Sequence, residues 1–69
     1  MQVIHLREEY IKLGQAIKAA GLVQTGAEAK VVIQDGQVKV NGQTQVQRGK
    51  KLVAGDRVEY NGETIRIEA

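Results

Sequence analysis

The residues of this chain best suited to chemistry are its cations, and they are most concentrated in the stretch "RGKK". Arg48, Lys50 and Lys51 fall within these four residues. Like charges this close repel one another, and such a run is often only a solvated loop. We therefore expect the whole segment "TQVQRGKKLVAGD", residues 44–56, to be a loop that faces water. Guanidinium and ammonium groups bind phosphate oxygens, so the cluster favours binding of a phosphate-rich partner.

The charge of the chain is distributed unevenly. The net charge is +2 and the pI is near 9.2. Residues 1–35 carry equal numbers of acids and bases, whereas residues 36–57 hold five cations against Asp56 alone, a net charge of +4. Residues 58–69 return to −2. The excess positive charge therefore surrounds the "RGKK" stretch, and this concentration favours an anionic partner such as nucleic acid.

Few other residues suit catalysis or metal binding. The chain has no cysteine and no serine, and His5 is its single histidine. A lone histidine is usually structural or simply exposed, and a zinc site needs several further ligands. Asp56 is interpreted as a turn acid, and the C-terminus "IEA" lacks the Gly-Gly through which β-grasp carrier proteins react. We expect no enzymatic activity, no metal, no cofactor and no small-molecule substrate.

Apolar run lengths and chain length set expectations about location and organisation. The longest apolar runs are a few residues, far below the roughly 20 needed to cross a bilayer. The start "MQVIHLREEY" has no basic stretch followed by a long apolar region, so we predict no secretory signal and no membrane association. With 69 residues, the chain is expected to form one domain, residues 1–69, as a cytoplasmic monomer.

The first predicted helix follows from apolar spacing. Leu13, Ala16, Ile17 and Ala20 recur at i, i+3, i+4 and i+7, which lines one face of a helix. This helix should end at Gly21, because glycine readily adopts the left-handed conformation that terminates helices.

The second predicted helix begins with a capping motif. Thr25 and Glu28 form a T-x-x-E capping box, in which the threonine oxygen accepts a first-turn amide and the glutamate accepts the amide of the cap residue. An apolar stripe over residues 29–33 continues the helix, and Asp35-Gly36 should end it. The two helices are short and adjacent, so we expect them to pack as a pair.

Alternating patterns predict strands elsewhere. "VIHL" near the N-terminus can form a short first strand. Residues 37–40 alternate polar and apolar and precede Asn41-Gly42, a strong signal for a two-residue hairpin turn. Residues 57–68 repeat this pattern around a second Asn-Gly. The expected fold is α+β, with two short packed helices against a small, mainly antiparallel sheet.

The order of these motifs resembles a known family. "KLGQAIKAAGLVQTGAEAKVVIQDGQVKVNG", continued by "GKKLVAGDRVE", resembles the RNA-binding domain named after ribosomal protein S4, also called the alpha-L RNA-binding motif. The matching positions are Lys12-Leu13, Gly21-Leu22, Thr25, Ala29, Val32-Ile33, Gly36, Val38, Val40-Asn41-Gly42 and Gly55-Asp56. The resemblance covers about residues 10–60, and its specificity lies in the ordered set rather than in any one tripeptide.

The resemblance implies a non-catalytic bacterial module that docks on structured RNA, either ribosomal or transfer RNA, in association with a ribosomal subunit. We expect hydrogen bonding from Thr25, beside its capping role, and phosphate contacts from cations that converge on one face. These cations are Lys12, Lys30, Lys39, Arg48, Lys50 and Lys51. The alternative is a small protein–protein interaction module, which an exposed apolar patch would favour.

Two positions depart from the family pattern. The arginine that usually follows the cap is Gly26 here, and the aspartate of the start motif is Gly14. The missing arginine removes an expected phosphate contact, so Lys30 and the "RGKK" stretch would carry more of the binding. With two tyrosines as the only aromatics, the chain offers no platform for stacking a run of single-stranded bases, so structured RNA is the expected partner.

Overall fold

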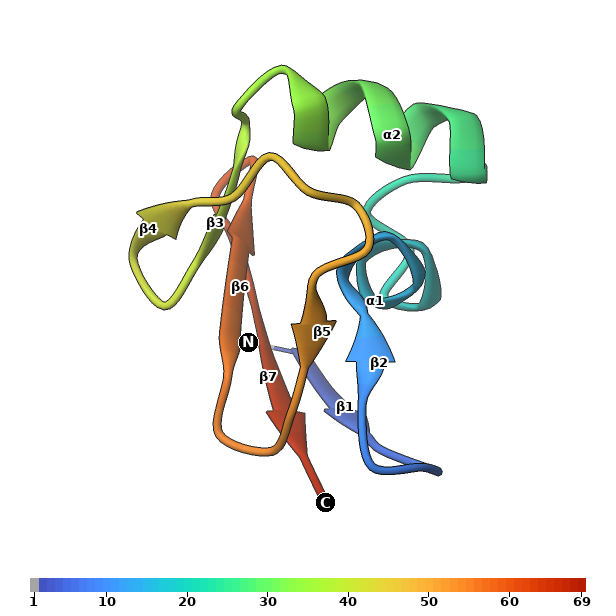
Figure 1. Cartoon of the computed structure of the whole chain (residues 1–69), viewed down its shortest axis with the longest axis vertical. Helices are drawn as coiled ribbons and strands as arrows, with labels where there is room; N and C mark the ends of the chain where they lie inside the picture. The colour runs from blue at the N-terminus through green and yellow to red at the C-terminus, as the bar shows by residue number, and fades with distance from the viewer. Residues whose placement is uncertain (1) are drawn as a thin grey trace.

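The computed structural model describes residues 2–69 and places two helices over one face of a sheet (Figure 1). The elements in chain order are β1 (Gln2–His5), β2 (Ile11–Lys12), α1 (Leu13–Ala19), α2 (Gly26–Gln34), β3 (Val38–Val40), β4 (Gln43–Thr44), β5 (Lys51–Leu52), β6 (Arg57–Tyr60) and β7 (Glu63–Glu68). Five strands form one sheet in the order β1-β7-β6-β3-β4, and β2 pairs with β5 in a second, two-stranded sheet. The predicted α+β class is confirmed.

Both helices end as their sequences predict. At the end of α1, the Leu22 amide donates to the Ile17 carbonyl and the Gly21 amide to the Lys18 carbonyl, both at 3.0 Å. This pair of bonds is a Schellman motif, which needs a positive φ that glycine adopts without strain. Gly21 has φ +76°, and Gly36 ends α2 in the same way with φ +78°.

The start of α2 confirms one half of the predicted capping box and corrects the other. The Oγ1 of Thr25 accepts the Glu28 amide at 3.1 Å, as predicted. The Glu28 carboxylate, however, accepts the amide of Gln24 at 2.8 Å, and not that of Thr25. Because Thr25 is extended (φ −133°, ψ 160°), the preceding amide comes within reach of the long glutamate side chain.

The sheet combines two predicted hairpins with two pairings that the sequence did not predict, β3 with β6 and β1 with β7. Asn41 and Gly42 have φ of 52° and 83° and join β3 to β4, and the second Asn-Gly joins β6 to β7. Positive φ at both central residues is the turn geometry that suits the twist of antiparallel strands. β1 lies parallel to β7, so the first and last strands of the chain are neighbours.

The core lies between the helices and the inner face of the five-stranded sheet. Among residues 2–69, it contains thirteen buried apolar residues: Leu13, Ala16, Ile17, Val23, Ala29, Val32, Ile33, Val38, Val40, Leu52, Val58, Ile65 and Ile67. Tyr60 is half-buried against this core, because it lies on the same face of β6 as the buried Val58. The outer face of the sheet is exposed and carries residues such as Lys39, Arg57 and Glu59.

The segment 44–56 is not a loop that faces water throughout, so this prediction is wrong. Leu52 is fully buried in the core, and β5 pairs with β2 through Ile11 with Leu52 and Lys12 with Lys51. A two-residue strand is too short to show a period of two in the sequence. One buried leucine is nevertheless enough to hold the segment against the body of the protein, because burying such a side chain contributes about 1.5–3 kcal/mol.

Candidate nucleic-acid interface

The "RGKK" stretch is tied by its backbone to the start of α1. The first helix amides have no partner within a helix, and here the Leu13 amide donates to the Lys50 carbonyl at 2.8 Å. The Gly14 amide donates to the Arg48 carbonyl at 3.1 Å. These bonds continue the β2–β5 pairing into the helix, so the cations of this stretch project from a fixed backbone.

A groove of about 340 Å³ opens where α1, α2 and the "RGKK" stretch meet. Three cations from separate segments, Lys12, Lys18 and Arg48, line it. The other lining residues are Gly14, Gln15, Gly26, Ala29 and Gly49. The lining contains no carboxylate, and its small residues allow a ligand to approach the backbone closely. We call it the cationic groove.

Gly14 permits the observed position of Arg48. A Cβ atom at Gly14 would lie 2.6 Å from the Cγ of Arg48 and 3.2 Å from its Cδ, closer than such atoms pack. The aliphatic part of the arginine therefore occupies the space that any side chain at position 14 would need. At Gly26, by contrast, an added Cβ would meet nothing within 4 Å.

Two lysines of this region face each other directly. Lys12 and Lys51 are cross-strand partners in the β2–β5 pair, and like charges in this arrangement destabilise a sheet. The Nζ of Lys51 lies 4.8 Å from the centre of the Tyr10 ring, and this cation–π contact offsets part of the repulsion. Local conflicts of this kind are expected at functional sites, where an anionic ligand would relieve them.

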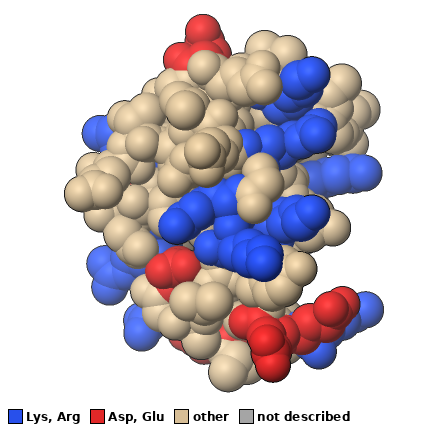
Figure 2. Space-filling view, in the orientation of Figure 1, with Lys and Arg blue, Asp and Glu red and all other residues tan. Residues whose placement is uncertain are grey.

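The cations of this surface are not neutralised by neighbouring carboxylates. Within residues 2–69, the one side-chain ion pair joins Arg66 and Glu68 at 3.3 Å on the last strand. Figure 2 shows Lys and Arg side chains gathered over the region of β5, β2 and the helices, with most acidic atoms toward the top and the bottom of the view. We define the cationic surface as Lys12, Lys18, Lys30, Arg48, Lys50 and Lys51.

The structure places the other predicted residues in different ways. Lys30 is exposed on α2, one turn beyond Gly26, and Gly26 lines the cationic groove. The Thr25 oxygen accepts the cap amide, which leaves its hydroxyl hydrogen available to a ligand. Lys39 lies on the outer face of the sheet opposite Glu59, because Val38 and Val40 fill the inner face of β3. The predicted convergence of Lys39 with the other cations is therefore wrong.

Lys18 also lines the cationic groove, a position that the sequence pattern did not predict. Its position off the apolar stripe of α1 indicated that it would be exposed. The residues near Lys18 in the sequence did not indicate what it would face, since the groove forms only when "RGKK" folds back against α1.

The structure shows neither a membrane-spanning helix nor a metal site among the residues it describes. Within residues 2–69, no helix has the length and apolar content of a membrane span, and no three His, Cys, Asp or Glu residues gather into a metal site.

Known bacterial proteins are similar in sequence to this chain over nearly its whole length. The protein YbcJ of Escherichia coli (strain K12) is 33% identical over 63 residues, which cover 91% of this chain and 90% of YbcJ. The "Probable ribosome maturation protein RlbA" of Bacillus subtilis (strain 168) is 41% identical over 59 residues, covering 86% of this chain and 83% of that protein.

Solved structures match the fold. The solution structure of E. coli YbcJ, described as revealing an alpha-L motif involved in RNA binding, has a TM-score of 0.77 and 33% identity. It matches over 100% of this chain and 89% of that one. The 30S ribosomal protein S4e of Thermoplasma acidophilum has a TM-score of 0.72 and 28% identity, over 87% of this chain and 32% of that one.

The sequence model of one protein family matches almost all of the helices and strands of this chain. The model of the S4 domain family matches residues 4–68, from β1 to the end of β7. This family match agrees with the order of helices and strands. It also agrees with the alpha-L architecture that the chain shares with YbcJ. The chain therefore belongs to the S4 domain family.

Proposed function

We propose that this protein binds structured RNA through the cationic surface and has no catalytic role of its own. The observation that carries the proposal is the cationic groove, where Lys12, Lys18 and Arg48 surround a lining without a carboxylate. Lys and Arg on phosphates supply affinity that does not depend on sequence. Because the backbone around the groove is fixed, the spacing of the cations selects RNA by the positions of its phosphates.

The relatives support a ribosomal setting for this activity. The name of the B. subtilis relative refers to ribosome maturation, and the matching part of S4e belongs to a protein of the small ribosomal subunit. We therefore propose that the protein acts in the cytoplasm and binds ribosomal RNA in preference to transfer RNA. Gly26 leaves open space where the family pattern has an arginine, so the cations of "RGKK" and Lys18 carry the contacts instead.

The aromatic residues favour structured over single-stranded RNA. Proteins that hold single strands stack successive bases on exposed aromatic side chains. Tyr60 is half-buried against the core, and one face of Tyr10 is covered by Lys51. Neither the outer face of the sheet nor the cationic surface offers a row of aromatic rings. Recognition should therefore rest on phosphates in a defined geometry.

The exposed apolar residues do not favour the alternative, a protein–protein interaction module. Val3, Val31, Val46 and Val53 are about half exposed or more. They come from β1, α2 and two separate parts of the segment 44–56, and scattered apolar residues of this kind are normal on a soluble protein.

Salt dependence tests the proposed function. If four to six phosphates are contacted, a plot of log affinity against log salt should have a slope of about −3 to −5 for a ribosomal RNA hairpin. The control is a single-stranded RNA of the same length, which should bind more weakly at every salt concentration. Fluorescence anisotropy measures both. A slope near zero, or equal binding of both RNAs, would contradict the proposal.

The contact between Gly14 and Arg48 gives a more local test. In Gly14→Ala the added Cβ must displace the Arg48 side chain, so RNA affinity should fall by about threefold to tenfold, the effect of losing one phosphate contact. The control is the same change in an Arg48→Ala background, where the added Cβ has no Cγ or Cδ to displace. We expect Gly14→Ala to leave the affinity unchanged in that background. An equal loss from Gly14→Ala with and without Arg48 would show that the position of Arg48 does not matter.

A further inference from the structure

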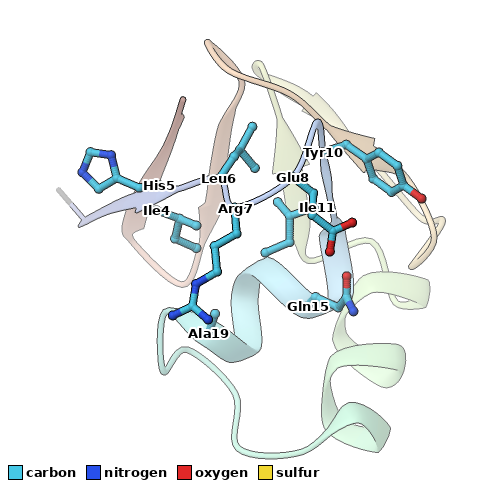
Figure 3. A pocket seen from close by; sticks show the side chains of 9 residues that line it. All are labelled: Ile4, His5, Leu6, Arg7, Glu8, Tyr10, Ile11, Gln15 and Ala19. Carbon is cyan, nitrogen blue, oxygen red and sulfur yellow. The ribbon is translucent and has the colours of Figure 1, made fainter.

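A second groove, of about 510 Å³, runs between residues 6–10 and α1 (Figure 3). It lies within the range of about 300–1,000 Å³ that is typical of sites for small ligands. Ile4, Leu6 and Ile11 line it and are partly buried against the core, so they give it an apolar floor. Ala19 extends this floor at the end of α1. We call it the apolar groove.

Polar side chains surround this floor. Figure 3 shows Arg7 reaching across the groove toward Ala19, while the Glu8 carboxylate lies on the side of Gln15. The Gln15 Oε1 accepts the Lys12 amide at 3.3 Å, which leaves its NH₂ group free to donate. An apolar floor edged by a guanidinium, a carboxylate and an amide suits a flat group with apolar faces and a hydrogen-bonding edge.

The apolar groove adjoins the cationic surface at two points. Gln15 lines both the apolar and the cationic grooves, and so marks the boundary between them. Tyr10, which lines the apolar groove, carries the Lys51 ammonium 4.8 Å from its ring centre. An RNA strand with its phosphates on Lys12 and Lys51 would therefore have an adjacent nucleotide next to the apolar groove.

We propose that the apolar groove receives one unpaired nucleobase of the RNA whose phosphates occupy the cationic surface. The inference rests on the proposed function and adds a requirement for a bulged or looped-out nucleotide. Glu8 disfavours a phosphate inside the groove but can accept a hydrogen bond from an amino group on a base edge. Arg7 offers a planar guanidinium on which a base can stack. The uncharged base, and not its phosphate, is thus the part that fits.

Three RNA hairpins test this inference. The first has a single bulged nucleotide in its stem, the second has the same bulge without its base, and the third has no bulge. The hairpin with the intact bulge should bind about tenfold more tightly than the other two, near the lower end of what one stacked base contributes. Equal affinity for all three would overturn the inference, as would equal affinity for the bulges with and without a base, because only backbone flexibility would then matter.

A pair of alanine-to-leucine variants locates the effect. Ala19→Leu fills the floor of the apolar groove without changing charge, and leucine is a good helix former. Ala54→Leu is the control, placed on the exposed turn between β5 and β6 and outside the lining of both grooves. Ala19→Leu should bind all three hairpins with the affinity of the unbulged one, while Ala54→Leu should keep the tenfold preference.

The outcomes separate this inference from the proposed function. A bulge preference that persists in Ala19→Leu would overturn the inference. A protein partner would then be the remaining candidate ligand for the apolar groove. Salt-dependent binding with no bulge preference would overturn the inference alone, since the cationic surface would still hold RNA. Absence of salt-dependent binding to any hairpin would overturn both.

Discussion

The double variant Lys50→Ala, Lys51→Ala should lose about 10- to 100-fold in affinity for a structured RNA at 0.1 M salt, and its salt slope should flatten by about one to two units. Both lysines project from the backbone that is bonded to the start of α1, so each can hold one phosphate. Loss of two phosphate contacts removes the counterion release that accompanies them. Anisotropy titrations at several salt concentrations measure the affinity and the slope together.

The control for this variant has the same change in net charge on the other face of the protein. Lys39→Ala, Arg57→Ala removes two cations from the outer face of the sheet. If the cationic surface is the interface, this control should keep the wild-type slope and nearly the wild-type affinity. Equal losses in the two double variants would show that only net charge matters, and that RNA binds without a defined surface.

The variant Leu52→Ala should destabilise the protein by about 2–5 kcal/mol, the usual cost of truncating a buried leucine. Leu52 is fully buried and is the one core residue contributed by the segment 44–56. A domain of this size has a small stability in total, so a large fraction of the molecules should unfold near room temperature. Urea denaturation followed by circular dichroism gives the free energy of unfolding.

Val53→Ala is the neighbouring control for Leu52→Ala. Val53 is 50% exposed, so its truncation should change the free energy of unfolding by less than about 0.5 kcal/mol. Similar denaturation curves for the two variants would mean that the segment is not anchored through Leu52. The cations of "RGKK" would then project from a mobile loop, without the fixed spacing on which the proposed recognition depends.

Much of the fold could be predicted because its signals are local. The glycines that end the two helices, the Thr25 cap and the two Asn-Gly turns each act within a few residues. Backbone conformation at such positions depends on the residue itself and on its nearest neighbours. The ordered family motifs predicted the architecture for the same reason, because many of their residues lie at these helix ends and turns.

The features that sequence reasoning missed depend on contacts between distant segments. β1 meets β7 across the whole length of the chain, and β5 meets β2 across about 40 residues. The same pairing brings Lys18 and Arg48 to one groove, while the inward-facing valines of β3 turn Lys39 to the other face. Charge counts along the sequence located the densest group of cations, but they could not assign each cation to a face.

Amide chemical-shift mapping with a ribosomal RNA hairpin tests the central claim most directly, since it reports on every segment at once. We predict the largest shifts at β2, at the start of α1, at the first turn of α2 and along residues 47–51, with β6 and β7 little changed. Shifts confined to residues 57–68 would contradict the claim that the cationic surface is where the RNA binds.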